Sequence, residues 1–176
     1  MAIYVTRHGQ TEWNAENKVC GITDIALTEK GIAQAEELAE QVKEKNIEII
    51  ISSPMKRAIA TSQIVSKKCH IPITVDDRLI EQNYGIYEGV DRKDEHFLAN
   101  KRNFAYRYPS GESMMQVAAR VYPLLDEIKK KYMGKNVLII CHGGVCRVIR
   151  TYFIDLTNEE FFQYSLQNCT LETYNE

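Results

Sequence analysis

An arginine and a histidine stand together near the start of the chain, where the apolar run Ile3 to Thr6 leads into Arg7, His8 and Gly9. A guanidinium donates hydrogen bonds to phosphate oxygens two at a time, and a neutral imidazole nitrogen can attack phosphorus once the phosphate charge is compensated. The pair is therefore typical of phosphate chemistry. Alone it is a weak signal, because a histidine at a strand end is more often structural.

Two later apolar runs end in residues of the same kind. After Ile49 to Ile51, the segment 52–58 reads Ser-Ser-Pro-Met-Lys-Arg-Ala, in which serine and proline predict a helix start and put Arg57 in its first turn. The run Val137 to Cys141 ends in His142 followed by two glycines, which let the backbone approach a ligand closely. We expect these side chains to point at one edge of a sheet, beside helix N–H groups that favour an anion.

A carboxylate completes this set of residues. The glycine-punctuated stretch from Leu79 to Gly89 contains Glu81. A carboxyl group in this position could donate and accept the proton that phosphoryl transfer requires.

These segments together resemble the histidine phosphatase superfamily, the phosphoglycerate-mutase-like proteins, over nearly the whole chain and in the expected order. The combination of Arg-His-Gly, Ser-Ser-Pro-x-x-Arg-Ala, Leu-x-Glu-x-x-x-Gly-x-x-Glu-Gly and a late His-Gly is highly specific. The resemblance implies that His8 is transiently phosphorylated and that Glu81 is the proton donor and acceptor. It also implies which residues hold the phosphoryl group or lie beside the substrate, and these are Arg7, Asn14, Gly21, Thr23, Arg57 and His142.

The chemistry of a phosphate monoester fits this set. The ester carries close to two negative charges near neutral pH, and its transition state spreads charge over three oxygens, which two arginines and a histidine can compensate. Glu81 would protonate the leaving alkoxide, which requires a raised pKa or a proton shared with the substrate, and would then take a proton from water. Neither step needs a metal or another cofactor. The four histidines form no His-x-x-x-His pattern, and Arg7 beside His8 would repel a divalent ion.

A second phosphatase signature overlaps the last histidine. Cys141 to Arg147 satisfies Cys-x5-Arg, in which backbone N–H groups and an arginine surround a phosphate and the cysteine thiolate is the nucleophile. Val148 follows where such loops commonly carry a hydroxyl residue, and under this hypothesis the other four segments would be coincidences. We therefore expect Cys141 to be a buried strand residue whose thiol packs as a small hydrophobe.

Two further alternatives concern the outcome of the reaction. Cofactor-dependent mutases of the family are longer by an insertion that encloses the substrate, and they carry Glu-Arg-His-Tyr-Gly where this chain has residues 81–85, Glu-Gln-Asn-Tyr-Gly. Loss of that basic pair and an open site favour hydrolysis over phosphoryl transfer. A non-catalytic phosphate-binding module would be expected to lack a catalytic residue, and here none is missing.

Apolar runs and helical periodicity alternate as strand and helix along the chain. This pattern predicts an α/β fold, a three-layer αβα sandwich with a mostly parallel central sheet and ligands at the carboxyl ends of its strands. We expect one domain over 1–176, with 90–109 as a flap over the site. Thr28 is expected to cap the first long helix, and Ser110 or Gly111 to open the fourth. The predicted strands are 2–7, 47–52, 71–75, 136–141 and 169–174, and the predicted helices are 28–45, 54–68, 111–132, 143–154 and 158–163.

Composition limits the class of protein. The 176 residues are 44% hydrophobic, enough for one sizeable core, and the formal net charge of −2 argues against nucleic-acid binding. Five cysteines at irregular spacing, without a signal peptide or a membrane span, predict reduced thiols in the cytoplasm. The expected partner is a small phosphorylated metabolite, with no membrane or nucleic-acid partner, and the protein is expected to be a monomer or homodimer.

Substrate specificity is the part that the sequence indicates least. Cations in or beside the predicted flap could meet a second anionic group, although a solvated charged face is the simpler interpretation for each; they are Arg92, Lys93, Lys101, Arg102 and Arg107. Four tyrosines could line a pocket for the leaving group or simply pack; they are Tyr84, Tyr87, Tyr106 and Tyr108.

Overall fold

A five-stranded sheet forms the centre of the computed structural model, which describes residues 1–175, and its strand order is β3-β2-β4-β1-β5. The strands β1 (Ala2–Arg7), β2 (Ile47–Ser52), β3 (Ile73–Val75) and β4 (Asn136–Cys141) run parallel. The last strand, β5 (Leu171–Asn175), pairs antiparallel with β1 at the sheet edge. The prediction of a mostly parallel sheet is confirmed.

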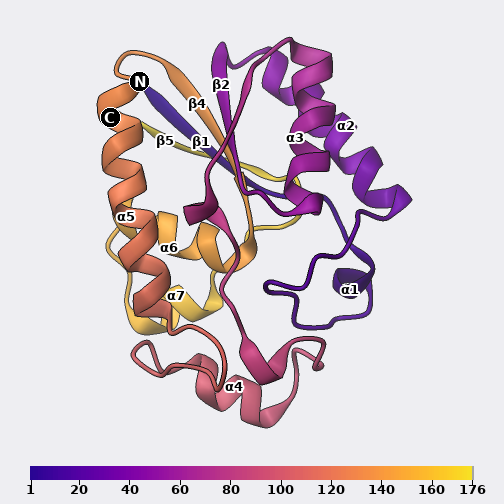
Figure 1. Ribbon diagram of the computed structural model, residues 1–176. Coiled ribbons are helices and arrows are strands. Elements are labelled where there is room, and N and C mark those ends of the chain that lie inside the picture. Colours follow the sequence, from indigo (N-terminus) through magenta and orange to yellow (C-terminus); the bar gives the residue numbers. More distant parts are fainter. Residues whose placement is uncertain (176) are drawn as a thin grey trace.

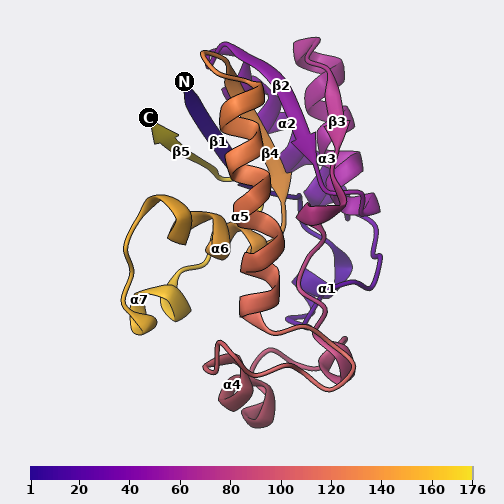
Figure 2. The ribbon, with the colours of Figure 1, turned by 60° about the vertical axis from the view of Figure 1, so that its left-hand side comes forward.

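Helices cover both faces of this sheet (Figure 1). On one face lie α2 (Glu29–Lys43) and α3 (Lys56–Cys69), and on the other lie α5 (Met114–Lys131) and α6 (Gly143–Phe153). Figure 2, a view turned by 60°, shows α5 in front of the sheet with α2 and α3 behind it. The predicted three-layer αβα arrangement is confirmed.

Side-chain alternation along the strands explains the three layers. Ile3 and Val5 of β1 pack in the core that contains α5 and α6, whereas Ala2 and Tyr4 pack in the core that contains α2 and α3. Successive residues of a strand point to opposite faces, so a strand that is apolar throughout has both faces buried. This is the reason why the central strands read as continuous apolar runs rather than as alternating ones.

The helix boundaries follow their caps. Thr28 caps α2 as predicted, and its hydroxyl accepts a hydrogen bond from the N–H of Gly31 at 3.1 Å. The fourth long helix, predicted over 111–132 with Ser110 or Gly111 at its start, begins instead after Ser113. Ser113 and Gln116 form a reciprocal capping box, with N–H to side-chain oxygen distances of 3.2 and 2.9 Å. The prediction of the cap was therefore wrong.

The other boundaries differ from the predictions by one or two residues. The helix predicted over 54–68 begins at Lys56, and its N-cap residue Met55 provides no side-chain hydrogen bond. The strands predicted over 71–75 and 169–174 span 73–75 and 171–175. The helix predicted over 143–154 ends at Phe153, and the predicted helix 158–163 is α7 (Asn158–Gln163).

The segment 90–109, predicted as a flap, contains a short helix, α4 (Glu95–Lys101). Phe97 and Tyr108 of this segment pack with Val19 and Tyr84 in a small separate core. Figure 1 shows α4, like the short helix α1 (Glu12–Ala15), beyond the end of the sheet at which β1 and β4 finish. Single 3-10 turns at Asp77–Leu79 and Gly85–Tyr87 lead into this region.

No helix within residues 1–175 is both long and apolar enough to cross a membrane.

Candidate active site

The two histidines predicted to act together follow adjacent parallel strands. In the register of β1 and β4, Arg7 is opposite Cys141, so His8 and His142 leave the sheet at the same point. The N–H of His8 donates to the carbonyl of Cys141 at 3.0 Å, and the two imidazole ring centroids are 5.1 Å apart. Both histidines therefore lie at the carboxyl ends of their strands, as predicted.

The Arg57 guanidinium lies between the two imidazoles. Arg57 is in the first turn of α3, as predicted, and it is completely buried. Its Nε is 3.1 Å from Nε2 of His8 and 3.2 Å from Nδ1 of His142, so one N–H is shared between two ring nitrogens. Its terminal nitrogens donate to two backbone carbonyls of the loop before α2, Thr23 at 2.9 Å and Gly21 at 2.6 Å.

These contacts fix the tautomer of each histidine. Nδ1 of His8 lies 2.7 Å from the carbonyl oxygen of Gly9, which can only accept, so Nδ1 carries the hydrogen. Nε2 of His8 then has a free electron pair directed at the N–H of Arg57. In His142, Nδ1 is the acceptor, and Nε2 donates to the hydroxyl of Ser53 at 2.7 Å.

Both imidazoles are held in the neutral form. Burial, reinforced by the charges of Arg57 and Arg7, lowers the pKa of His8 well below its usual value. Burial and the charge of Arg57 lower the pKa of His142 in the same way. A neutral His8 keeps the electron pair that a nucleophile needs.

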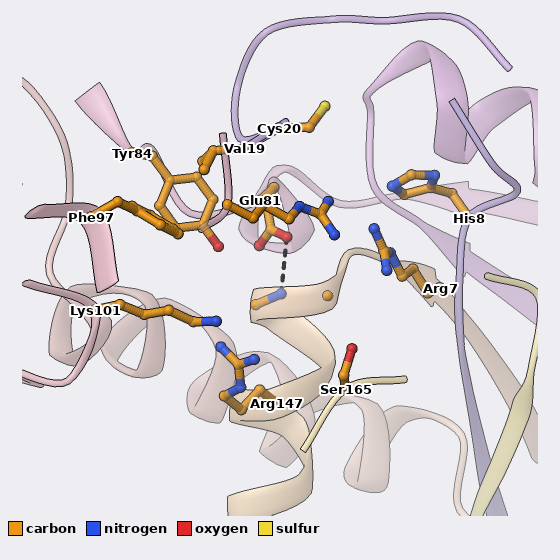
Figure 3. Close-up of a pocket in the computed structure, with 13 residues that line it drawn as sticks. Arg7, His8, Val19, Cys20, Glu81, Tyr84, Phe97, Lys101, Arg147 and Ser165 are labelled. Carbon is orange, nitrogen blue, oxygen red and sulfur yellow. Dashed lines mark hydrogen bonds between the residues drawn. The ribbon is translucent and has the colours of Figure 1, made fainter. Parts of the chain in front are cut away.

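A pocket opens in front of His8 (Figure 3). Nε of Arg7, a buried donor in the pocket lining, has no hydrogen-bond acceptor among residues 1–175, and neither has Nδ2 of Asn14, a predicted site residue that lies outside the lining. The Asn14 amide is oriented by its oxygen, which accepts from the N–H of Thr11 and from Asn168. Buried polar groups are nearly always paired, so the orphaned donor of Arg7 in the same pocket as the neutral His8 indicates a site for an anion. Asn14, whose oxygen shares the Asn168 amide with the carbonyl of His8, offers a second donor. The lining residues are Arg7, His8, Val19, Cys20, Glu81, Tyr84, Arg92, Phe97, Lys101, Gly143, Gly144, Arg147 and Ser165.

Glu81 lies in the pocket wall and is held by backbone N–H groups. Its carboxylate accepts from Gly144 at 2.9 Å and Val145 at 3.2 Å, both in the first turn of α6, and from Gln82 at 2.8 Å. Glycine at position 144 leaves room for this carboxylate, because a Cβ there would stand 2.6 Å from Oε1 of Glu81 and displace it. The first turn of α6 therefore positions the carboxylate within the same pocket as His8.

Sequence reasoning gave no role to Glu88, which organises the loop that holds Arg57. Its carboxylate accepts from the N–H groups of Gly21, Ile22 and Thr23 at 3.1 to 3.2 Å and from the hydroxyl of Thr23 at 2.7 Å. The carbonyls of Gly21 and Thr23 in turn bind Arg57. The sequence feature that could have indicated a role for Glu88 is the Glu-Gly pair at the end of the motif that begins with Leu79.

The structure brings the predicted site residues together but gives them different positions. Arg7, His8 and Glu81 line the pocket. Arg57 and His142 are fully buried behind His8 and contact it rather than the pocket. Gly21 and Thr23, which the resemblance places beside the substrate, contact Arg57 through their carbonyls.

Of the five flap cations, Arg92 and Lys101 line the pocket, and Tyr84 does so among the four tyrosines. Lys93, Arg102 and Arg107 are exposed and lie outside the lining. Tyr87, Tyr106 and Tyr108 also lie outside it and pack in or beside the small core around Phe97. Sequence reasoning missed Cys20 and Ser165 as lining residues, and it considered Arg147 only as part of the cysteine signature.

The Cys-x5-Arg signature does not form a phosphate loop. Helix α6 begins at Gly143, so most of the residues between Cys141 and Arg147 are helical rather than wrapped around an anion. The thiol of Cys141 is fully buried in the core, 3.5 Å from that of Cys146. It packs as a small hydrophobe, as expected, and does not line the pocket.

Within residues 1–175, no group of three or more His, Cys, Asp and Glu side chains is arranged to hold a metal ion.

Comparison with known proteins agrees with this geometry. A sequence profile of the histidine phosphatase superfamily (branch 1) matches residues 3–175. The chain belongs to the histidine phosphatase superfamily. It is 35% identical over 150 residues to the uncharacterized phosphatase PhoE of Bacillus subtilis, a match that covers 85% of this chain and 76% of that protein. It is 32% identical over 178 residues to the probable phosphoglycerate mutase GpmB of Shigella boydii, covering 97% of this chain and 83% of the relative.

Solved structures share the fold over almost the whole chain. Bacillus stearothermophilus YhfR superposes with a TM-score of 0.87 at 28% identity, covering 98% of this chain and 89% of that one. The phosphoserine phosphatase of Entamoeba histolytica, solved with 3-phosphoglyceric acid, gives a TM-score of 0.85 with the same identity and coverage.

Proposed function

We propose that this protein is a metal-independent phosphatase that hydrolyses small phosphate monoesters through a phosphohistidine on Nε2 of His8. The observation that carries the proposal is the fixed tautomer of His8. Its Nδ1 hydrogen is bound to the Gly9 carbonyl, and its Nε2 electron pair is directed at the shared N–H of Arg57. The orphaned donors Arg7 Nε and Asn14 Nδ2 supply partners for phosphoryl oxygens.

In the first step, a phosphoryl oxygen of the bound substrate replaces Nε2 of His8 as the acceptor of the Arg57 N–H. The freed Nε2 electron pair then attacks phosphorus in line with the ester oxygen. An N–P bond forms while the P–O bond to the leaving group breaks, and the leaving alkoxide takes up a proton that Glu81 shares with the bound phosphate monoester. Arg7 and Arg57 compensate the charge on the three remaining oxygens, Asn14 adds a neutral donor, and His142 acts by orienting Arg57. Nδ1 of His142 accepts a hydrogen bond from the same Arg57 N–H that faces His8, so a neutral His142 keeps the guanidinium in place.

In the second step, water attacks the phosphohistidine. A P–O bond forms, the N–P bond breaks and returns the electron pair to Nε2, and Glu81 takes the proton of the water. Inorganic phosphate leaves, and the enzyme returns to its starting protonation state. Neither step uses a metal, and the charge of Arg7 beside His8 disfavours a divalent ion at this point.

Hydrolysis is favoured over mutase activity by residues 82 and 83. The amide of Gln82 is buried and donates to the carbonyl of Glu112 at 3.1 Å, and that of Asn83 donates to the carbonyl of Ser110 at 3.3 Å. Neither residue lines the pocket. The PhoE likeness agrees with hydrolysis, whereas the GpmB likeness makes phosphoglycerate mutase activity the second candidate. Five free cysteines support a reducing compartment, the cytoplasm.

The proposal is tested with chelator-treated protein and an aryl phosphate, comparing wild type, His8→Ala and Cys141→Ser. Turnover should be lost only in His8→Ala, and the trapped protein should carry a phosphoryl label that is stable in base and labile in acid. Loss only in Cys141→Ser would make the cysteine the nucleophile. Binding of phosphate esters with no phosphate release in wild type would identify a non-catalytic module. Interconversion of phosphoglycerates that outpaces phosphate release would identify a mutase.

A further inference from the structure

Two cations point toward one another in the pocket, at a distance from the nucleophile. Lys101 is the last residue of α4, and Arg147 lies in the second turn of α6. In Figure 3 their charged ends converge on one side of Glu81, while Arg7 and His8 lie on the other side. Two residues that are far apart in the sequence thus lie in one wall of the pocket.

The pocket carries more positive charge than a phosphate dianion requires. Four cations line it, Arg7, Arg92, Lys101 and Arg147, against the single carboxylate of Glu81. The oxygens of Glu81 are bound to backbone N–H groups rather than to a cation. Within residues 1–175, neither Lys101 nor Arg147 forms an ion pair with a carboxylate. Charges of one sign that outnumber the counter-charges in a concave site raise the local concentration of the opposite ion.

Packing holds Arg147 in this position. Two of its guanidinium nitrogens donate to the carbonyl of Tyr164 at 3.3 and 3.0 Å, and the guanidinium lies 5.4 Å from the ring centroid of Phe161. These contacts are all neutral, so they orient the guanidinium without compensating its charge. Only 7% of Arg147 is exposed.

Lys101 is half-buried beside this fixed charge. Burial, together with the charges of Arg147 and Arg92, lowers the pKa of Lys101 to about 8. The ammonium form still predominates at neutral pH, and an anion placed between Lys101 and Arg147 would stabilise it.

We propose that Lys101 and Arg147 form a second anion site, which selects phosphate monoesters whose leaving group carries a carboxylate or a second phosphate. This inference rests on the proposed function, because it identifies the substrate class of the same pocket. The scissile phosphate, with about two negative charges, is compensated by Arg7 and Arg57. The anion on the leaving group then lies beyond Glu81, where it reaches the second pair of cations.

The test compares 4-carboxyphenyl phosphate with its methyl ester, which has the same ring and no charge on the substituent, at constant ionic strength. The measured quantity is the ratio of kcat/KM for the acid to that for the methyl ester. Lys101→Met removes the charge and keeps the length of the side chain. Arg102→Met is the matched control, because Arg102 is the next residue, is exposed and lies outside the pocket lining.

Wild type should prefer the acid, and Lys101→Met should lower the ratio by about tenfold, the effect of losing a hydrogen bond between charged groups. Arg147→Lys, which retains a charge, should lower it less than Lys101→Met does. Arg102→Met should leave it unchanged. 1,4-Phenylene bisphosphate distinguishes the anions: turnover faster than that of the carboxylate assigns the site to a second phosphate, and slower turnover assigns it to a carboxylate.

A kcat/KM ratio near one in wild type, or an equal ratio in wild type and Lys101→Met, would overturn the second anion site but leave the proposed phosphatase activity unaffected. Absence of turnover with all three esters, in a protein whose His8→Ala variant behaves identically, would instead remove the proposed function and this inference with it.

Discussion

The stability of the protein should depend steeply on pH between 7 and 5, because two of its four histidines are buried in the neutral form. Burial and Arg57 hold the pKa of both His8 and His142 well below the usual 6.5. The unfolded chain therefore binds protons in this range that the folded protein does not. Stability is fully present above pH 6.5 and is lost as the pH falls below it.

The magnitude follows from linkage. A histidine with an unfolded pKa of about 6.5 that stays neutral in the folded state loses about 2 kcal/mol between pH 7 and pH 5, so two such residues lose about 4 kcal/mol. This is a large share of the roughly 5 to 15 kcal/mol of a typical domain. Carboxylates whose pKa is lowered by ion pairs, such as Asp76 and Glu127 beside Arg78, contribute mainly below this window.

The assay is urea unfolding at pH 7 and pH 5, followed by the fluorescence of the single tryptophan, Trp13, and by circular dichroism. His8→Gln and His142→Asn keep an acceptor for Arg57 and should each remove about half of the pH dependence. His70→Gln and His96→Gln are controls, because both residues are exposed. The reasoning is refuted if wild type loses less than about 1 kcal/mol, or if the two buried-site variants retain the full slope.

Two further changes test how the site is positioned. Gly144→Ala should lower kcat at least tenfold in steady-state assays, because the new Cβ would stand 2.6 Å from Oε1 of Glu81. Gly143→Ala is the control and should lower kcat much less, since the nearest neighbours of its Cβ are 3.7 Å away or more. Equal losses of kcat in the two variants would contradict this explanation. Glu88→Gln should reduce kcat and lower the free energy of unfolding in urea by about 2 kcal/mol, because the Glu88 carboxylate accepts four hydrogen bonds from the loop 21–23. The control Glu95→Gln changes an exposed residue and should alter neither quantity.

The sequence contained enough to predict the sheet and the edge at which His8 and His142 lie. The strands before His8 and His142 are nearly continuous apolar runs, and the carboxyl ends of parallel strands lie at one edge of a sheet, so the sequence alone predicts that these two histidines lie together. The cap of α5 was also readable, since Ser113 and Gln116 have capping-box spacing. Ser110 was a poorer choice because its backbone is left-handed, with φ of 59°, which a helix start does not use.

Other parts of the site depend on contacts between distant segments, which no local pattern specifies. The bonds of Arg57 to Gly21 and Thr23 exist because Glu88 folds that loop, and nothing in the spacing of these residues gives the distance between them. The meeting of Lys101 with Arg147 depends on how α4 packs through Phe97 onto the small core. A sequence can identify such cations, but it cannot tell which of them face a pocket.

The position of β1 in the sheet also has a consequence for biosynthesis. Within the described residues 1–175, β1 forms strand pairs only with β4 and β5, which begin at Asn136 and Leu171, so both of its edges lack partner strands while more than a hundred residues are translated. At about 5 to 20 residues per second this interval is on the order of ten seconds. An apolar strand with open edges is a template for aggregation during that time. The nascent chain should therefore depend on chaperones more than its modest size suggests, and the histidine pair can form only late in synthesis.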